Sequence, residues 1–414
     1  MRFGLLTQWY DPEPGPAALP GSLARGLVER GHRVQVVTGF PNYPTGVLAD
    51  GYRQSPCLDE VIDGVAIRRV PLFPSHDASP AKRVLNYGSF ALSASLAGLS
   101  ALDGIDALWV NYSPVTVGLP MLLQRAMRRT PTVAHVLDLW PDTLFASGFG
   151  GRGRAGAIAE DALSLWCNAL YRNSERVAYI SPGVGDVLRD RGVPQKKLVY
   201  APMWADEGVF DAHDVPVERG WGLGDGDVAL VYAGTLGGAQ ALDSLIHACA
   251  DLKDEPRFRC LIAGSGVREA ELRRLAERVD ASNVAFLGRL DRAALRSLMA
   301  AGDVHYIGLN DHRLAATTMP SKVQTTFACA RPVIASLVGD AAQVVKNADA
   351  GWVVPPSQSK MLAQAMRSAV KAGRAGLASR GRKARLYYET EFSARVGIDR
   401  IERLLVDVAE EGVA

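Results

Sequence analysis

The chain has 414 residues, of which 48% are hydrophobic and 22% are charged. This is enough polypeptide for two or three domains with hydrophobic cores, and the balance excludes a disordered or collagen-like chain. Lysine and arginine number 46 against 44 for aspartate and glutamate, a net charge of +2. So small an excess excludes a protein that binds nucleic acid through bulk positive charge, and we expect no nucleic-acid partner.

The cysteines are scattered, without paired spacing and without a histidine cluster nearby, at Cys57, Cys167, Cys249, Cys260 and Cys329. Neither a disulfide framework nor a zinc site is expected from this pattern. The amino terminus turns polar by Thr7 and Gln8, so it lacks the apolar run of a signal peptide. We therefore expect a reduced, cytoplasmic protein.

The first forty residues follow the pattern strand, turn, helix, strand. An apolar run at residues 3–6 precedes the turn DPEPGP, leucines recur at helical spacing until Gly31, and VQVVT at residues 34–38 completes a βαβ unit. Further strands are predicted at residues 66–70, 107–110, 132–137 and 177–181. The first half of the chain is therefore predicted to be α/β.

Residues 84–102 contain no charged side chain and follow Lys82 and Arg83, which gives them a superficial likeness to a membrane span. They also contain Asn86, two glycines and four serines. This polarity favours a helix that is buried in the domain, or one that lies at a membrane face, over one that crosses the bilayer.

The second half repeats the alternation of strands and helices. It begins with VALVYA at residues 228–233, and three helices follow in which apolar residues share the same offsets. The later strands are predicted at residues 259–263, 284–287, 304–309, 332–335 and 352–354, and an amphipathic helix at residues 393–411. Such alternation builds a parallel sheet with helices on both faces.

A linker is expected at residues 202–226, where periodicity is weak and aspartate and glycine are frequent. The predicted fold class is therefore α/β with two doubly wound domains. Ligands bind at the carboxyl ends of the strands in such sheets, so we expect the site in a cleft between the two domains.

The turns exclude several nucleotide chemistries. The first turn reads QWYDPEPG in place of GxGxxG, and the second strand ends in Thr38-Gly39-Phe40 without an acidic residue, which argues against a dinucleotide-dependent dehydrogenase. No GxxxxGK(S/T) loop, HExxH helix or GxSxG elbow occurs. Two reactions of proteins with two nucleotide-binding domains remain possible, namely sugar transfer and sugar epimerisation.

Three glycine-containing turns directly follow apolar strands, at residues 234–238, 264–266 and 286–289. Glycine lets a ligand approach the backbone closely, so the amides of these turns are candidates for holding a diphosphate or reading a base edge. A single turn of this kind could simply end a strand. Three at one edge of one sheet indicate a nucleotide site.

A further helix is predicted to begin within TTMPSK, with Pro320 near its first position and Ser321 or Thr318 as its cap. Lys322 then lies in the first helical turn. A cation is unfavourable at a helix amino terminus unless an anion is present, so Lys322 is a candidate phosphate ligand.

Eight stretches follow one another over nearly the whole chain: QWYDPEPG, ERGHRVQVVTGFPNYPTG, DLWPD, YAGTLGGAQAL, LIAGSG, FLGRL, MPSKVQ and ARPVIA. In these stretches the chain resembles retaining family-4 glycosyltransferases of GT-B fold, and most of all the bacterial surface-polysaccharide branch with colanic-acid and L-fucosamine type transferases. The resemblance implies two Rossmann-like domains that face each other across a cleft.

The resemblance also implies that the two domains bind different substrates. Residues 1–205 would bind the acceptor, residues 206–385 the nucleotide sugar, and residues 386–414 would form helices that cross back to the first domain. The donor would be a UDP-linked sugar of N-acetylhexosamine type, and the acceptor a sugar or a lipid-linked molecule. Peripheral association with the inner face of the cell membrane is then expected, with the basic helix at residues 121–129 as one candidate contact.

Carried over residue by residue, the resemblance assigns donor binding to the glycine turns and to the helix of Lys322. The implied donor-binding residues are Gly15, Gly234, Thr235, Leu236, Gly237, Gly264, Gly266, Leu287, Arg289, Leu290, Pro320, Ser321, Lys322, Gln324 and Thr325. The implied acceptor-binding residues are Asn42, Tyr43 and His135. The expected catalytic residues are Lys322, which would stabilise the departing diphosphate, and Asp138, which would orient the acceptor.

The sequence departs from the family in three motifs. One is the loss of the Arg and Lys that commonly follow the first strand of the second domain, where TLGGAQ has neutral residues. Many members carry two glutamates separated by seven residues, and these positions are Thr317 and Thr325 here. The histidine of the amino-terminal strand motif aligns with Leu137, although His135 lies on the same face two residues earlier. The chain shares PSK-x-Q with its own branch, so Lys322 and Gln324 are expected to do the work of the glutamate pair.

No metal and no other cofactor is expected, because the one DxD sequence, Asp225 to Asp227, precedes a strand and reads as a turn. Other functions stay open at this stage. They are a transferase of natural-product biosynthesis with a soluble acceptor, a UDP-sugar epimerase of the same fold, and a non-catalytic protein that binds sugar nucleotides.

Overall fold

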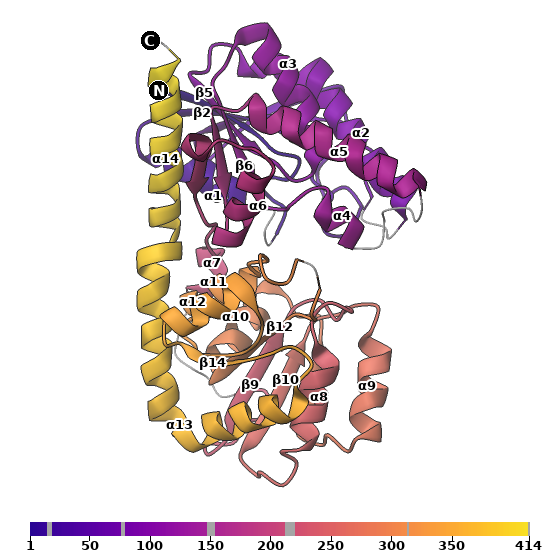
Figure 1. The fold of residues 1–414 in the computed structure, drawn as a ribbon, viewed down its shortest axis with the longest axis vertical. Coiled ribbons are helices and arrows are strands. Elements are labelled where there is room, and N and C mark those ends of the chain that lie inside the picture. Colours follow the sequence, from indigo (N-terminus) through magenta and orange to yellow (C-terminus); the bar gives the residue numbers. More distant parts are fainter. Residues whose placement is uncertain (15–18, 76–78, 147–153, 212–219, 313, 413–414) are drawn as a thin grey trace. The chain divides into compact units, whose positions relative to one another are not determined.

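The computed structural model describes residues 1–14, 19–75, 79–146, 154–211, 220–312 and 314–412. The chain divides into two compact units, each built on its own sheet (Figure 1). Unit 1 contains Met1–Met203 and the residues from Ala394 onward, and unit 2 contains Trp204–Ser393. The boundaries predicted from the sequence were 205/206 and 385/386.

Unit 1 contains an eight-stranded sheet of order β3-β4-β2-β1-β5-β6-β7-β8, in which β3 pairs antiparallel with β4 and the other pairs are parallel. The strands are β1 (Arg2–Leu6), β2 (Arg33–Gly39), β3 (Leu58–Ile62), β4 (Val65–Val70), β5 (Ala107–Asn111), β6 (Thr132–Val136), β7 (Arg176–Tyr179) and β8 (Leu198–Tyr200). Every residue of β5 and β6 is buried, because helices cover both faces of the sheet.

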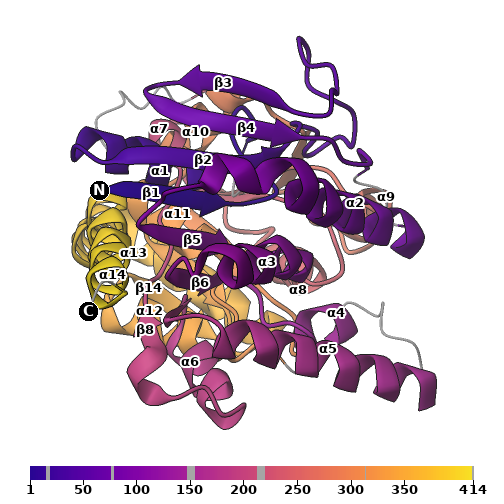
Figure 2. The same ribbon diagram turned by 90° about the horizontal axis from the view of Figure 1, so that it is seen from above.

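The helices of unit 1 form two layers (Figure 2). They are α1 (Leu19–Glu29), α2 (Pro80–Ser93), α3 (Gly118–Arg128), α4 (Asp142–Ala146), α5 (Arg154–Arg172), α6 (Pro182–Asp190) and α14 (Ala394–Glu411). One layer contains α2, α3 and α5, and the other contains α1 and α14. The last helix is anchored beside α1 because Glu402 bonds both the Arg30 guanidinium, at 3.0 Å, and the His32 ring, at 2.7 Å.

The uncharged stretch at residues 84–102 is helical throughout. Helix α2 continues into a π-helical turn, Ala94–Gly98, and a 3₁₀ turn, Leu99–Leu102. The side of the helix that includes Phe90 is buried, as expected for a helix within the domain. The side that includes Leu92 and Leu96 is exposed. Among the described residues, no helix is both long enough and apolar enough to cross a membrane.

Unit 2 contains a wholly parallel six-stranded sheet of order β11-β10-β9-β12-β13-β14. The strands are β9 (Val228–Ala233), β10 (Phe258–Ala263), β11 (Val284–Gly288), β12 (Val304–Gly308), β13 (Val333–Ser336) and β14 (Gly351–Val354). The helices are α7 (Glu207–Phe210), α8 (Leu242–Ala250), α9 (Glu269–Arg278), α10 (Arg292–Ala301), α11 (Ser321–Ala328), α12 (Gly339–Asn347) and α13 (Ser359–Tyr387).

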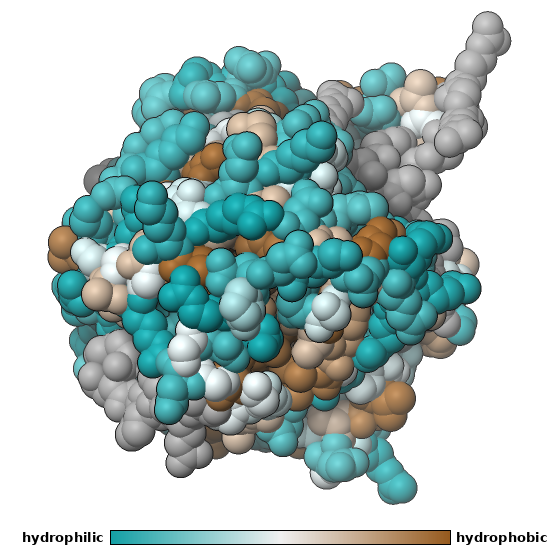
Figure 3. All heavy atoms as spheres, turned by 90° about the horizontal axis from the view of Figure 1, so that it is seen from below, coloured by the Kyte–Doolittle hydropathy of each residue, from teal (hydrophilic) through white to brown (hydrophobic). Residues whose placement is uncertain are grey.

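Two apolar clusters, one with Leu245 and Ile262 and the other with Leu261 and Met299, form the core of unit 2. The predicted α/β class with two doubly wound domains is thus confirmed, although the short strands β3 and β8 were not foreseen. Hydrophilic residues cover most of the face shown in Figure 3, with hydrophobic residues in smaller separate areas between them.

Candidate active site

Helix α11 begins without a side-chain cap. Its capping position is Pro320, in an extended conformation with φ −63° and ψ 130°. The hydroxyl of Thr318 donates to the carbonyl of Leu314 at 2.7 Å, and the expected cap by Ser321 or Thr318 is therefore wrong. The amino-terminal end of α11 keeps its partial positive charge without a side chain to offset it.

Lys322 extends from this first turn to the glycine turn after β9. A Cβ built on Gly234 would lie 2.7 Å from Cε and 2.8 Å from Nζ of Lys322. The ammonium lies 5.4 Å from the centroid of the Tyr232 ring. Loss of water around the ammonium lowers the pKa of Lys322, and among the described residues no carboxylate pairs with it. A half-buried cation at a positive helix end is an anion-binding arrangement.

The glycine turns after β9 and β10 pack tightly on each other. A Cβ on Gly264 would lie 1.8 Å from the carbonyl oxygen of Gly234, and one on Gly266 would lie 2.3 Å from that of Leu236. Gly234 and Gly264 have φ angles of +151° and +134°, which side chains disfavour. Glycine is required at these positions by the packing of the turns themselves.

Several amides of these turns are already hydrogen-bonded within unit 2. The amide of Gly234 donates to Ala263 at 3.0 Å, that of Leu236 to Ser265 at 2.9 Å, and that of Gly264 to Gly288 at 2.8 Å. The sequence led us to expect these amides on a diphosphate. Their bonds leave that task to other groups at the same edge, foremost Lys322 and the end of α11.

The other predicted donor-binding residues surround this edge. Arg289 is exposed after β11, between the half-buried Leu287 and Leu290. Gln324 is buried on α11, and its Oε1 has no hydrogen-bond partner. The hydroxyl of Tyr232 donates to the carbonyl of Thr235 at 2.7 Å and thereby holds the first turn. Four more predicted residues belong to the turn after β9 and to α11 with its capping position: Gly237, Pro320, Ser321 and Thr325.

In unit 1, Asp138 and Ser113 follow the adjacent strands β6 and β5. Asp138 is exposed, and its Oδ2 accepts a hydrogen bond of 2.7 Å from the hydroxyl of Ser113. Burial raises the pKa of Tyr87, with Arg83 opposing the rise and the nearby Asp138 carboxylate adding to it. Asp138 therefore stands at the carboxyl edge of the sheet, accessible to an acceptor.

An aromatic group that the sequence did not reveal lies at the same edge. The ring of Trp9, in the turn after β1, lies 6.3 Å from that of Tyr43 and 6.2 Å from that of Tyr87. All three residues are half-buried. Aromatic rings of this kind can pack against the apolar face of a sugar ring. The three residues are far apart in the sequence, so no local sequence pattern predicted that they would lie together.

Glu13 joins the turns that carry this group. The residue is 4% exposed, and its carboxylate accepts amide hydrogen bonds from Asn42 at 2.8 Å, Tyr43 at 2.8 Å and Tyr10 at 3.0 Å. Burial raises the pKa of Glu13, whereas these three hydrogen bonds oppose the rise. The sequence analysis did not single out Glu13, although it lies within QWYDPEPG.

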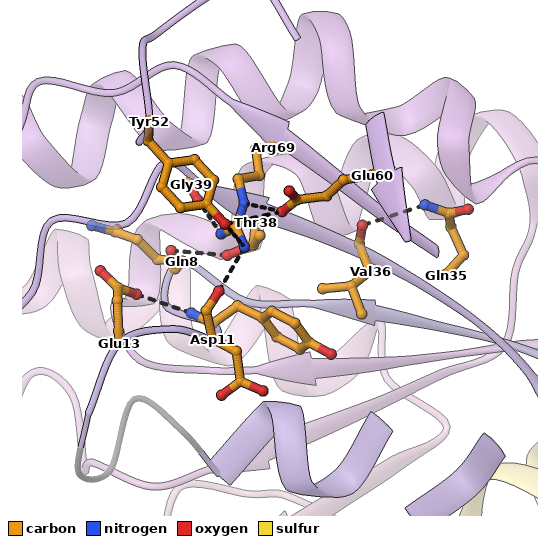
Figure 4. A network of polar contacts seen from close by, with 11 residues as sticks. Gln8, Asp11, Glu13, Gln35, Val36, Thr38, Gly39, Tyr52, Glu60 and Arg69 are labelled. Carbon is orange, nitrogen blue, oxygen red and sulfur yellow. Dashed lines mark hydrogen bonds and ion pairs between the residues drawn. The ribbon is translucent and has the colours of Figure 1, made fainter. Parts of the chain in front are cut away.

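Arg69 contacts the turn after β1 through its guanidinium, as Figure 4 shows. Its buried guanidinium donates to the carboxylate of Glu60 at 2.5 Å and to the carbonyl of Asp11 at 2.6 Å. It also lies 4.8 Å from the centroid of the Tyr52 ring. A buried arginine needs such partners, and they hold the turn in place.

Two predicted acceptor-binding residues lie in the core. Nδ1 of His135 accepts from the Trp109 indole at 3.3 Å, and Nε2 donates to the carbonyl of Ala201 at 2.8 Å. Burial lowers the pKa of His135 to about 4. Asn42 is 4% exposed and donates to the carbonyl of Phe40 at 3.0 Å. We correct both residues to structural roles, and of the three only Tyr43 lies within reach of solvent.

Gly15 falls outside the described residues. Among the described residues, no group of three or more His, Cys, Asp or Glu side chains is placed to hold a metal ion. Asp227 of the DxD sequence accepts a hydrogen bond of 2.9 Å from the amide of Gly224, which is the geometry of a turn.

The chain matches two protein families in succession. Residues 15–204 match the family described as "Glycosyl transferase 4-like domain", and residues 227–372 match "Glycosyl transferases group 1". A protein assigned to colanic acid biosynthesis as the glycosyl transferase WcaI, from Escherichia coli (strain K12), is 27% identical over 326 residues. That alignment covers 77% of this chain and 79% of the relative.

Solved glycosyltransferases share the fold over almost their whole length. Anabaena Alr3699/HepE, solved in complex with UDP and glucose, has a TM-score of 0.68 at 15% identity and covers 98% of this chain and 100% of its own. The trehalose 6-phosphate synthase of Burkholderia multivorans has a TM-score of 0.71 at 13% identity, covering 100% and 98%. The chain is therefore a GT-B glycosyltransferase that combines a glycosyl transferase 4-like domain with a glycosyl transferases group 1 domain, and it is related to transferases of colanic acid biosynthesis.

Proposed function

We propose that the protein transfers an N-acetylhexosamine-type sugar from a UDP-linked donor to a hydroxyl group, with retention of configuration. The observation that carries this proposal is the Lys322 ammonium, which is half-buried, has no carboxylate partner among the described residues, and lies beside the uncapped start of α11. Two positive features thus converge where a diphosphate would leave. The solved relative bound to UDP and glucose supports UDP as the nucleotide.

The reaction breaks the bond between the anomeric carbon and the diphosphate oxygen, and UDP departs with the electron pair. The acceptor oxygen bonds to the anomeric carbon on the same face, and its proton passes to the departing phosphate oxygen. Lys322 and the start of α11 stabilise the negative charge that grows on this oxygen. A metal is not required for this stabilisation, because the ammonium supplies the positive charge.

The acceptor would bind to unit 1 at the carboxyl edge of its sheet. Asp138, with Ser113 bonded to its carboxylate, would orient the attacking hydroxyl. The rings of Trp9, Tyr43 and Tyr87 would stack on a sugar of the acceptor. The relative in colanic acid biosynthesis supports an acceptor from polysaccharide assembly. We propose a sugar or a lipid-linked molecule at the inner face of the cell membrane as this acceptor.

Titration calorimetry with UDP tests the donor half. We expect Lys322→Ala to weaken UDP binding about tenfold or more, which corresponds to about 1.4 kcal/mol or more. Lys346→Ala, at an exposed lysine of α12 in the same unit, is the matched control and should bind UDP normally. Equal affinity of the Lys322→Ala variant and the parent protein would remove Lys322 from the mechanism.

The release of UDP from a UDP-sugar tests the reaction type. A transferase releases UDP in step with added acceptor, apart from slow hydrolysis. An epimerase would convert the donor sugar without any acceptor, and a binding protein would do neither. Conversion of the UDP-sugar into a different UDP-sugar in the absence of acceptor would therefore overturn the proposal.

A further inference from the structure

The turn DLWPD, residues 138–142, follows β6 and carries Asp138. The amide of Trp140 donates to the carbonyl of Asp138 at 3.0 Å. The amide and the hydroxyl of Thr143 both donate to the carbonyl of Leu139, at 2.8 Å and 3.0 Å. These bonds fix the shape of the turn. Its place in unit 1 depends on contacts with segments farther along the chain.

Arg191 connects this turn to the end of α6. Its guanidinium donates to the carbonyl of Trp140 at 2.6 Å and to the carboxylate of Asp142. The side chains of Arg191 and Asp142 are only 20% and 12% exposed. Because little water surrounds this ion pair, its attraction is weakly screened. A guanidinium that donates to two acceptors also fixes their direction, and not only their distance.

The backbone of Arg191 is itself fixed in place. Arg191 is the carboxyl-terminal cap of α6, and its amide donates to the carbonyl of Val187 at 3.0 Å. Gly192 follows with a φ of +82° and ends the helix. On the other side, burial raises the pKa of Tyr171 in α5 to about 12, and the nearby Arg191 charge opposes the rise. The guanidinium therefore lies between α5 and the turn of Asp138.

We propose that Arg191 is a positioning residue for sugar transfer. Through the carbonyl of Trp140 and the carboxylate of Asp142, it holds the turn so that Asp138 can orient the acceptor hydroxyl. Ser113 fixes the carboxylate of Asp138, and Arg191 fixes the backbone from which that side chain extends. The inference rests on the proposed function, because it takes Asp138 as the residue that orients the acceptor.

The rate of acceptor-dependent UDP release tests the proposal. Arg191→Met keeps an apolar stem and loses the guanidinium, so Asp138 should shift. A misplacement of about 1 Å can cost about 100-fold in rate, and we expect kcat to fall about tenfold or more. UDP affinity should stay the same, because Lys322 and α11 belong to unit 2. Arg191→Lys keeps the charge without the planar fork, so it should restore kcat in part.

The matched control is Arg189→Met. Arg189 lies on the same helix, its side chain is 52% exposed, and it pairs with Asp186 at 2.9 Å. This control removes an arginine and an ion pair from α6 and should keep the kcat of the parent protein. An equal loss of kcat in Arg189→Met and Arg191→Met would overturn the proposal.

Stability and positioning are separated by a second variant and by the temperature of the assay. Asp142→Asn weakens the same contact from the side of the turn, so its kcat should also fall. Rates are measured where circular dichroism shows that each variant is folded, so that lower stability alone does not change kcat. If Arg191→Met does not fold, Asp142→Asn carries the test. Parental kcat in the folded variants would overturn the proposal.

A double-mutant cycle shows whether Arg191 acts through Asp138. In Asp138→Asn the carboxylate is already lost, so adding Arg191→Met should change kcat by less than about twofold. The same substitution in the parent protein should cost about tenfold or more. An equal loss in both backgrounds would show that Arg191 acts independently of Asp138, and would overturn the proposal.

The outcomes separate this inference from the proposed function. A parent protein that releases no UDP when acceptor is added would contradict the proposed function and the inference with it. Full activity of Asp138→Asn would contradict the role of Asp138 and thus the basis of the inference. Full activity of Arg191→Met beside an impaired Asp138→Asn would contradict the inference alone.

Discussion

The carboxylate of Glu13 accepts hydrogen bonds from the backbone amides of Asn42 and Tyr43, both at 2.8 Å, across 29 and 30 residues of sequence. The other carboxylate oxygen accepts from the amide of Tyr10 at 3.0 Å. Two turns that carry Trp9 and Tyr43 are thereby fixed to each other. A buried acidic residue stabilises the aromatic side of the candidate acceptor site without facing the acceptor itself.

Replacing Glu13 by Gln should loosen these turns. The amide group of glutamine cannot accept hydrogen bonds at both of its ends, so at least one backbone amide loses its partner. We expect a loss of about 1–3 kcal/mol in the free energy of unfolding and a higher KM for acceptor, with UDP affinity unchanged. Urea denaturation and acceptor kinetics measure these effects. Glu29→Gln, on the exposed side of α1, is the control, and equal stability of the two variants would contradict this role.

Two buried histidines should make the protein sensitive to mild acid. Burial lowers the pKa of His135 to about 4 and that of His305 to about 3, against about 6.5 in the unfolded chain. Between these values the unfolded state binds more protons, so stability falls as the pH falls. Lowering the pH from 7.5 to 5 should cost about 2 kcal/mol for each histidine.

Urea denaturation at both pH values, in the parent protein and in His135→Gln, isolates this effect. Glu13 acts in the opposite sense, because burial raises its pKa, so the difference between variants is more informative than the total. The variant should lose less stability than the parent on acidification. His247→Gln, at an exposed position of α8, should behave like the parent. Identical pH dependence in His135→Gln and the parent would show that His135 does not act in this way.

A methyl group on Gly264 should disrupt the donor site. It would approach the carbonyl oxygen of Gly234 to 1.8 Å, at a φ of +134° that side chains disfavour. We expect Gly264→Ala to lower stability by about 3 kcal/mol or more and to abolish UDP binding. Gly238→Ala is the control in the same turn sequence, because a Cβ there meets nothing within 4 Å. Thermal unfolding and calorimetry compare the two, and normal UDP binding by Gly264→Ala would be incompatible with tight packing of the turns.

Asp138→Asn should impair transfer without affecting the donor. The exposed carboxylate accepts from Ser113 and is placed to orient a hydroxyl, and an amide retains its shape but loses its charge. We expect kcat/KM for acceptor to fall roughly 100-fold while UDP affinity stays the same. Asp161→Asn, at an exposed position of α5, is the control. Full activity of Asp138→Asn would leave the acceptor to be oriented by other groups.

Chelation should leave UDP binding intact if the Lys322 ammonium, and not a metal ion, meets the diphosphate. We expect the UDP affinity in excess EDTA to remain within about twofold of that in buffer with magnesium. Calorimetry in the two buffers measures this directly. A large loss of affinity in EDTA that magnesium restores would show that the diphosphate needs a metal ion.

The alternation of apolar runs and helical periodicity determined the fold class of this protein, because both patterns are local and repeat with a period that the chain itself displays. The glycine turns and the position of Lys322 at the start of α11 were equally visible in the sequence. Glu13 and Trp9 were not singled out, because their partners come from other turns that only the folded sheet brings to one edge.

The direction in which each buried strand residue points its side chain also depended on tertiary structure. His135 lies on β6, which is buried on both faces, so alternation along the strand could not tell an inward residue from one that faces a ligand. In the same way, glycines in the sequence indicate a tight turn, but they do not show whether the backbone amides of that turn bond a ligand or a neighbouring turn. Those choices depend on contacts between segments far apart in the chain, and the sequence determines them only through the folded whole.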